Sequence, residues 1–107
     1  MVTLKAFVQV IDPATDLLVG AVLAPNPLVG AHTLYIYAPG LGASDSMRLG
    51  FYDLAGQMVV QAYGQGPSRQ LIVPNDVSGG VYLVVMEARS AETGAFERRV
   101  FKVALVR

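Results

Sequence analysis

Residues 47–63 of the chain read MRLGFYDLAGQMVVQAY, and this stretch decides the expected fold class. Apolar side chains alternate or form short runs on both sides of a small turn, which is typical of strands and not of a helix. The connection between the two runs is Leu54, Ala55 and Gly56. The glycine can adopt the positive φ that a short hairpin with a bulge requires. The stretch therefore predicts a β-hairpin over 47–53 and 57–63.

The rest of the chain repeats this pattern of short strands and turns. Two prolines in three residues at 25–27 exclude a central strand there, because each proline removes a donor from the ladder. We expect strands over residues 2–10, 17–23, 33–38, 47–53, 57–63, 70–73, 81–88 and 96–106, the first two as a hairpin. These strands predict one all-β domain, an antiparallel β-sandwich of seven to eight strands without significant helix; a small closed barrel is the alternative. The predicted core centres on Leu49, Phe51, Val60, Leu83 and Val85.

The composition excludes several classes of function. The chain has 107 residues, 53% of them hydrophobic and 15% charged, so it can bury a core of its own and is not disordered. Eight Lys and Arg residues balance eight Asp and Glu residues, which leaves no broad basic field for a nucleic-acid partner. No cysteine is available for disulfides or thiolate metal sites. No apolar run approaches the roughly 18 residues of a membrane span, and the first residues do not have the pattern of a signal peptide.

The candidate catalytic and metal-binding residues lack the partners that such chemistry needs. His32 is the only histidine, and its segment supplies no nucleophile or further ligand, which indicates a surface or loop residue. Asp12 and Asp16 are close enough to share a calcium ion, but they fit turn capping better because the spacing of a calcium loop is missing. The glycine pairs at 40–42 and 64–66 do not precede the helix that a phosphate loop requires. We expect no enzyme, no cofactor and no metal.

Four blocks of sequence from residue 24 onward occur in the order found in a known family. They are APNP at 24–27, LGFYDLAGQMV at 49–59, SGGVYLV at 78–84 and the closing FKVALVR at 101–107. Together they resemble the C-terminal sorting domains of the type IX secretion system. The immunoglobulin-like domain of flagellar hook-cap proteins is similar in the same places. The positions that carry the resemblance are Pro25, Asn26, Pro27, Tyr52, Asp53, Gly56, Gly80, Tyr82, Lys102 and Arg107.

The resemblance implies an immunoglobulin-like β-sandwich on a secreted protein of Bacteroidota-like bacteria. Such a domain is read by the outer-membrane translocon and is often removed when the cargo is attached to the surface. We therefore expect a non-catalytic sorting or surface-attachment module, extracellular or on the bacterial cell surface, with the secretion and attachment machinery as its protein partners. The same motifs also have a structural interpretation, since Asp53 and Gly56 suit a tight hairpin and Gly80 suits a turn into a core strand.

Residues 1–23 precede the family-like region 24–107 and suggest a second class of function. One face of the first expected strand is apolar and needs burial; it consists of Val2, Leu4, Ala6, Val8 and Val10. This strand could complete the sheet of a neighbouring copy by strand addition. The alternative hypothesis is a self-assembling extracellular filament subunit whose partners are copies of itself. A chain that holds only this domain is either a piece of a larger protein or a module with a role of its own.

Two further groups of residues leave alternatives open. The last expected strand is mildly basic, with Arg98, Arg99, Lys102 and Arg107. These residues either form a solvated strand face whose charges discourage pairing with the edge strand of another sheet, or they form a recognition surface. Three tyrosines also have two interpretations. They could form an exposed stacking face for a carbohydrate or protein, or they could be buried in the core of the sandwich; they are Tyr35, Tyr37 and Tyr63.

Overall fold

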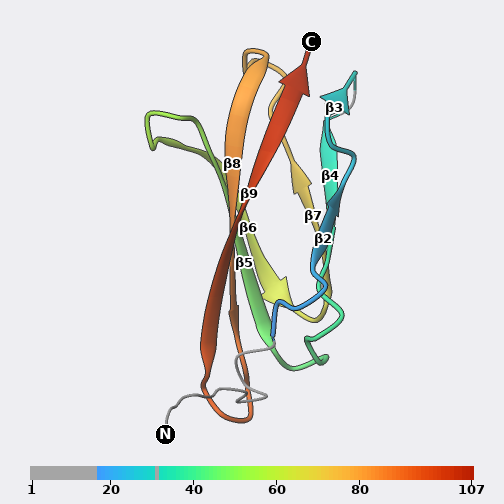
Figure 1. Ribbon diagram of the computed structural model, residues 1–107, viewed down its shortest axis with the longest axis vertical. Coiled ribbons are helices and arrows are strands. Elements are labelled where there is room, and N and C mark those ends of the chain that lie inside the picture. The colour runs from blue at the N-terminus through green and yellow to red at the C-terminus, as the bar shows by residue number, and fades with distance from the viewer. Residues whose placement is uncertain (1–16, 31) are drawn as a thin grey trace, which may run out of the picture.

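Eight strands joined by turns make up the part of the chain that the structure describes, residues 17–30 and 32–107 of a computed structural model (Figure 1). They are β2 (Val22–Ala24), β3 (Leu28–Val29), β4 (Thr33–Tyr37), β5 (Ser46–Tyr52), β6 (Met58–Gln65), β7 (Ser68–Ile72), β8 (Gly80–Arg89) and β9 (Phe96–Val106). The predicted all-β class is confirmed, and these residues contain no helix. A helix long and apolar enough to cross a membrane is accordingly not found in the described segments.

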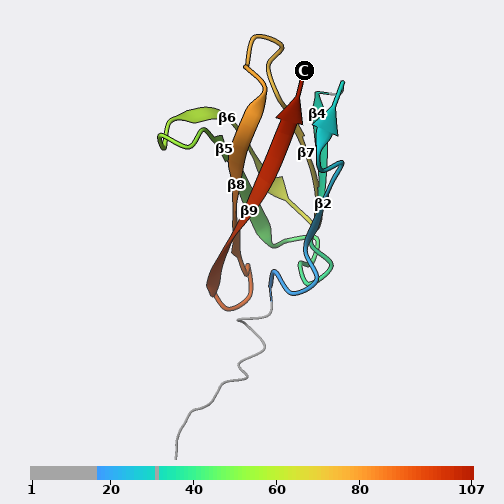
Figure 2. The same cartoon turned by 45° about the horizontal axis from the view of Figure 1, so that its top comes forward.

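The strands form two separate sheets, which Figures 1 and 2 show as two layers. One sheet has the order β2-β4-β7, and the other has the order β3-β9-β8-β5-β6. Neighbouring strands are antiparallel except β3, which runs parallel to the end of β9. Two sheets with a shared core are the predicted β-sandwich, and the closed barrel is excluded.

Each sheet contributes alternate apolar side chains to one common core. Leu49 and Phe51 of β5 are fully buried, as the sequence predicts. Leu34 of β4 and Leu71 of β7 supply the opposite layer and belong to the same buried cluster. Val60 of β6 is half-buried and packs against this cluster, so it lies at the border of the predicted core.

The expectation that Leu83 and Val85 face the core is wrong. Tyr82 and Val84 are buried instead, while Leu83 and Val85 are half-buried on the outer face of the five-stranded sheet. Both faces of β8 are apolar, so the local pattern does not say which of them points inward. Pairing with β5 decides it: Phe51 lies directly opposite Val84, and opposite residues of paired strands share a face.

The apolar run at 17–23 closes one end of the sandwich and is not a continuous strand. Leu17 and Leu18 are buried in a turn, and only residues 22–24 pair with β4. The backbone of Leu18 is fixed by β9, since its N–H donates to Glu97 Oε1 (2.9 Å) and its carbonyl accepts from Arg99 Nη1 (3.0 Å). The predicted strand over 17–23 is therefore wrong for residues 17–21. The apolar pattern there comes from leucines that are buried in a turn and not from a strand. Its expected hairpin partner, 2–10, lies outside the described residues.

Asp45 ties together the loops at this end of the sandwich. Its carboxylate accepts from the N–H of Gly42 (2.8 Å) and from the N–H of Ala91 (2.9 Å), and its carbonyl accepts from the N–H of Gly66 (2.9 Å). The backbone donor at Gly42, followed by that at Ala91, holds the pKa of the Asp45 carboxyl below its ordinary value. The carboxylate thus joins the loop before β5 to the loop between β8 and β9.

Candidate functional site

Four of the ten positions that carry the family resemblance lie near the end of β9, in a region that we call the C-terminal corner: residues 25–27, the 73–79 loop and Arg107. The first part of it is Asn26, which lies between two prolines that follow cis peptide bonds. The Asn26 amide nitrogen donates to the carbonyl of Lys102 (3.0 Å), and the amide oxygen accepts from the N–H of Ala104 (3.3 Å). The side chain lies at the edge of β9 just before the residues that pair with β3. Its amide therefore takes the place of the backbone donor and acceptor that a residue of a paired strand would supply.

Arg107 forms the second part of the corner. Its Nε donates to the carbonyl of Val77 (2.8 Å) and its Nη2 to the carbonyl of Pro74 (2.8 Å). Its Nη1 lies 3.2 Å from Nδ1 of His32, which must be the acceptor because a guanidinium only donates. Three donors on one planar group thus hold the last residue against the 73–79 loop and against the segment before β4.

Tyr82 supports the same loop from the core. Its hydroxyl donates to the carbonyl of Ser78 (2.5 Å), and its ring stacks on Phe51 with centroids 4.8 Å apart and an interplanar angle of 19°. The chain approaches β9 closely at this point, because a Cβ on Gly79 would lie 3.1 Å from the carbonyl oxygen of Leu105. Gly80 follows with a φ of 153°, which favours glycine. Loop and terminal strand are therefore one packed unit.

Three motif positions form a separate unit at the β5–β6 turn. The Asp53 carboxylate accepts from the N–H of Ala55 (3.0 Å) and of Gln57 (2.9 Å), and Gly56 has a φ of 88°. The ring of Tyr52 covers Gly50, where a Cβ would lie 2.5 Å from the ring. These residues build the expected tight hairpin, and within the described part of the chain their side chains form no hydrogen bond or ion pair with the corner.

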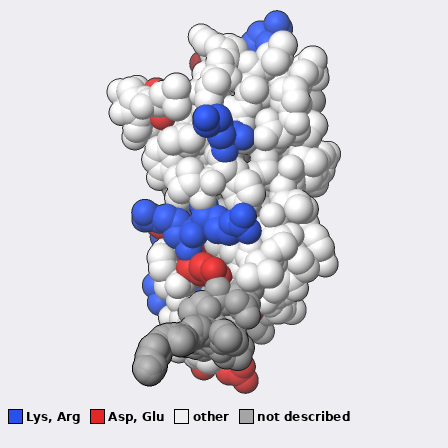
Figure 3. Space-filling model, viewed as in Figure 1, with Lys and Arg blue, Asp and Glu red and all other residues white. Residues whose placement is uncertain are grey.

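The basic residues of β9 do not form one surface. Arg98 points outward and pairs with Glu87 (3.1 Å), whereas Arg99 points inward and lies over the Phe101 ring (5.2 Å). Arg107 is used in the corner, and the side chain of Lys102 is exposed. Figure 3 shows the basic side chains in separate groups with uncharged surface between them. Of the four, Lys102 is the one whose side chain has no hydrogen bond, ion pair or cation–π contact within the described residues.

The described residues contain no group of three His, Cys, Asp or Glu side chains able to hold a metal ion. His32 is exposed and contacts Arg107, a partner that sequence reasoning missed because the two residues are 75 positions apart. Asp12 and Asp16 lie outside the described residues. The carbonyls of Pro74, Val77 and Ser78 were also missed, since a backbone acceptor leaves no signal in the sequence.

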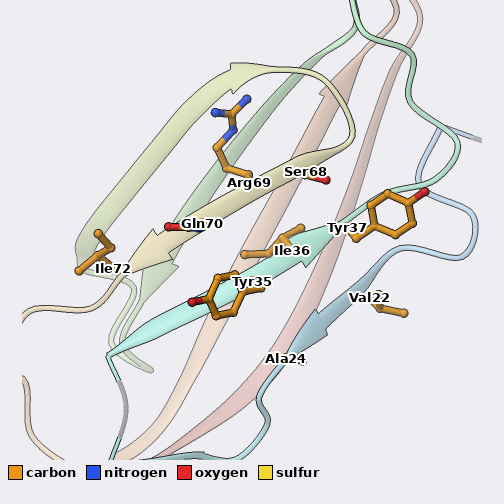
Figure 4. A pocket seen from close by; sticks show the side chains of 9 residues that line it. All are labelled: Val22, Ala24, Tyr35, Ile36, Tyr37, Ser68, Arg69, Gln70 and Ile72. Atoms are coloured by element: carbon orange, nitrogen blue, oxygen red, sulfur yellow. The ribbon is translucent and has the colours of Figure 1, made fainter.

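The three tyrosines of the proposed stacking face are exposed but divide between the two sheets. Tyr35 and Tyr37 lie on the outer face of β4, 56% and 49% exposed. Tyr63 is 68% exposed on β6, in the other sheet. The first pair lines an open groove of about 780 Å³ together with residues of β2 and β7 (Figure 4).

Comparisons with known proteins support the fold. No protein-family model and no curated protein matches the chain. Among solved structures, it is similar to PorZ of Porphyromonas gingivalis, described as an essential bacterial surface component of the type IX secretion system. The match has a TM-score of 0.63 and 21% identity, and it covers 88% of this chain but only 12% of PorZ. The chain is also similar to CopC from Methylosinus trichosporium OB3b, with a TM-score of 0.56, 19% identity and coverage of 80% of this chain and 93% of CopC. At these identities the likeness establishes a shared β-sandwich fold.

Proposed function

We propose that the chain is a non-catalytic sorting or surface-attachment module of a secreted or cell-surface bacterial protein. The observation that carries the proposal is the C-terminal corner, in which Asn26 and Arg107 fix the end of β9 through five polar contacts. Sequence blocks that resemble type IX sorting domains supply both residues, and the sandwich fold is shared with a surface component of that system. The proposed location is the cell surface or the extracellular space.

A patch beside the corner is suited to contact with a protein of the secretion or attachment machinery. On the outer face of β8 and β9, Lys102 stands among the exposed side chains of Val81 (41%), Val100 (55%) and Val106 (45%). A single cation within an apolar surface is typical of protein recognition sites, where apolar area supplies affinity and charge supplies orientation. Because the corner holds β9 in place, the backbone beneath this patch is already ordered, and the ordering cost of binding falls on side chains such as that of Lys102.

The test is export of a reporter fused to the full chain in a bacterium that has a type IX secretion system. We expect Lys102→Ala to lower the surface-to-total ratio of the reporter severalfold. Arg48→Ala is the matched control, because Arg48 is also an exposed cation on the outer face and its contact with Glu87 is a loose 4.0 Å. Equal display of both variants, with both folded by circular dichroism, would exclude a role for the patch.

A filament subunit is the second candidate, and one observation favours it. Among the described strands β6 pairs only with β5, and its eight residues include no charge and no proline, the usual protection of a sheet edge. A donor strand from residues 2–10 of a neighbouring copy would add to this edge. Sedimentation at rising concentration tests the idea. Growth of large particles supports it, and a compact monomer throughout contradicts it.

A further inference from the structure

The outer face of the three-stranded sheet has the chemistry of a ligand site that is separate from the proposed sorting function. Its central strand, β4, presents Tyr35 and Tyr37 on one side while Leu34 and Ile36 fill the core on the other. Both rings lie on the outer side of the sheet in Figure 4, flanked by side chains of β2 and β7. The flanking residues that share this side are Val22, Ala24, Ser68, Gln70 and Ile72.

No formal charge projects from this face among the residues that line it. The one cation of the lining, Arg69, alternates to the inner side of β7 and donates from Nη2 to the carbonyl of Gln65 (2.6 Å). Its guanidinium covers Gly64, where a Cβ would lie within 2.6 Å of three of its atoms. In Figure 4 the Arg69 side chain points away from the tyrosines. The groups left for a ligand are aromatic rings, hydroxyls, one amide and short apolar side chains, which select an uncharged partner.

The size of the face favours a small ligand over a protein. Three strands about 4.8 Å apart and a central strand of five residues at about 3.4 Å each give an area of roughly 200–300 Å². A stable protein–protein interface needs about 800 Å² on each partner. The groove is also open, so a purely apolar molecule would leave much of its surface in water, whereas small-molecule sites usually bury most of an apolar ligand.

We propose that this face binds a neutral oligosaccharide. A pyranose ring has one side made of C–H groups and a rim of hydroxyls, so it can stack on a tyrosine ring while its polar rim remains in water. Tyr35 and Tyr37 are two residues apart on one strand and so offer two successive stacking positions about 7 Å apart. Gln70 is directly opposite Tyr35 in the register, and Ser68 is directly opposite Tyr37. Each ring therefore has a neighbouring group that can hydrogen-bond to sugar hydroxyls.

The experiment titrates the full chain with cellohexaose, laminarihexaose, mannohexaose and chitohexaose. Binding is followed by calorimetry and by amide chemical shifts. We expect at least one of these probes to bind with a dissociation constant on the order of 1 mM or below. Shifts should be largest in β4 and β7. Tyr35→Ala and Tyr37→Ala should each weaken binding about fivefold to tenfold, as expected when one stacking contact is lost.

Tyr63→Ala is the matched control, because it removes an exposed tyrosine from the opposite sheet and should leave the affinity unchanged. Absence of binding by all four probes overturns the proposal. So does binding that the Tyr35 and Tyr37 variants leave intact, or a concentration-dependent dimer that those variants abolish, which would make this face a contact between copies. The reporter-export test does not involve these residues, so the two proposals can fail independently.

Discussion

Replacing Asn26 with alanine tests whether its side chain stabilises the end of β9 in the C-terminal corner. The substitution removes two side-chain hydrogen bonds, to the Lys102 carbonyl and from the Ala104 N–H, at 3.0 and 3.3 Å. Each such bond contributes about 0.5–1.5 kcal/mol net, and both lie at an exposed edge where water can replace part of the loss. We expect Asn26→Ala to lower the free energy of unfolding by about 1–2 kcal/mol, out of a total of roughly 5–15 kcal/mol for a domain of this kind.

The assay is urea unfolding of the full chain followed by circular dichroism. With a slope of about 2 kcal/mol per molar urea, the predicted loss moves the midpoint down by roughly 0.5–1 M. Asn75→Ala is the matched control, since Asn75 is exposed in the adjoining loop and should shift stability by less than about 0.5 kcal/mol. Equal midpoints for Asn26→Ala and Asn75→Ala would show that the Asn26 contacts do not stabilise the end of β9.

Three further predictions concern the core and the loops. Phe51→Ala should destabilise the chain by about 3–5 kcal/mol, because the ring is fully buried and stacks on Tyr82; an unchanged thermal midpoint would contradict that packing. Leu83→Ala should lower the free energy of unfolding clearly less than Phe51→Ala in the same melts, since Leu83 lies on the outer face. Equal losses of stability would show that Leu83 is buried in the core. Asp45 has a lowered pKa in the folded state, so its contribution is complete above the unfolded value and is lost as pH falls through the folded one. Asp45→Asn should therefore flatten the loss of stability between about pH 5 and pH 2, and an unchanged slope in acid titrations would exclude this role.

The parts of the fold that the sequence predicts are those with strong local signals. The strand at 96–106 has the predicted ends because a turn at Thr93 and Gly94 precedes it and a long alternating run follows. The turn around Asp53 and Gly56 is likewise local, since the hydrogen bonds that close it join residues within four positions. Such features depend on turn chemistry and periodicity, which can be read without knowledge of distant contacts.

The errors arise where distant residues decide the structure. The inward face of β8 depends on its register with β5, and the turn at 17–20 depends on Glu97 and Arg99, 79 and 81 positions away from Leu18. β3 has two residues and pairs in parallel with β9, so it carries no periodic signal. The resemblance identified Asn26 and Arg107 as motif positions, but their hydrogen-bond partners became known from the structure.

The proposed sorting role requires that the chain direct export to the cell surface, and this property should transfer to an unrelated protein. The measurement fuses the full chain to the C-terminus of a periplasmic reporter and compares a host with an intact type IX translocon with a host that lacks it. Antibody labelling of intact cells then gives the surface fraction of the reporter. We expect surface reporter in the first host and retention in the periplasm in the second. Retention in both hosts, with the fused domain folded, would contradict it.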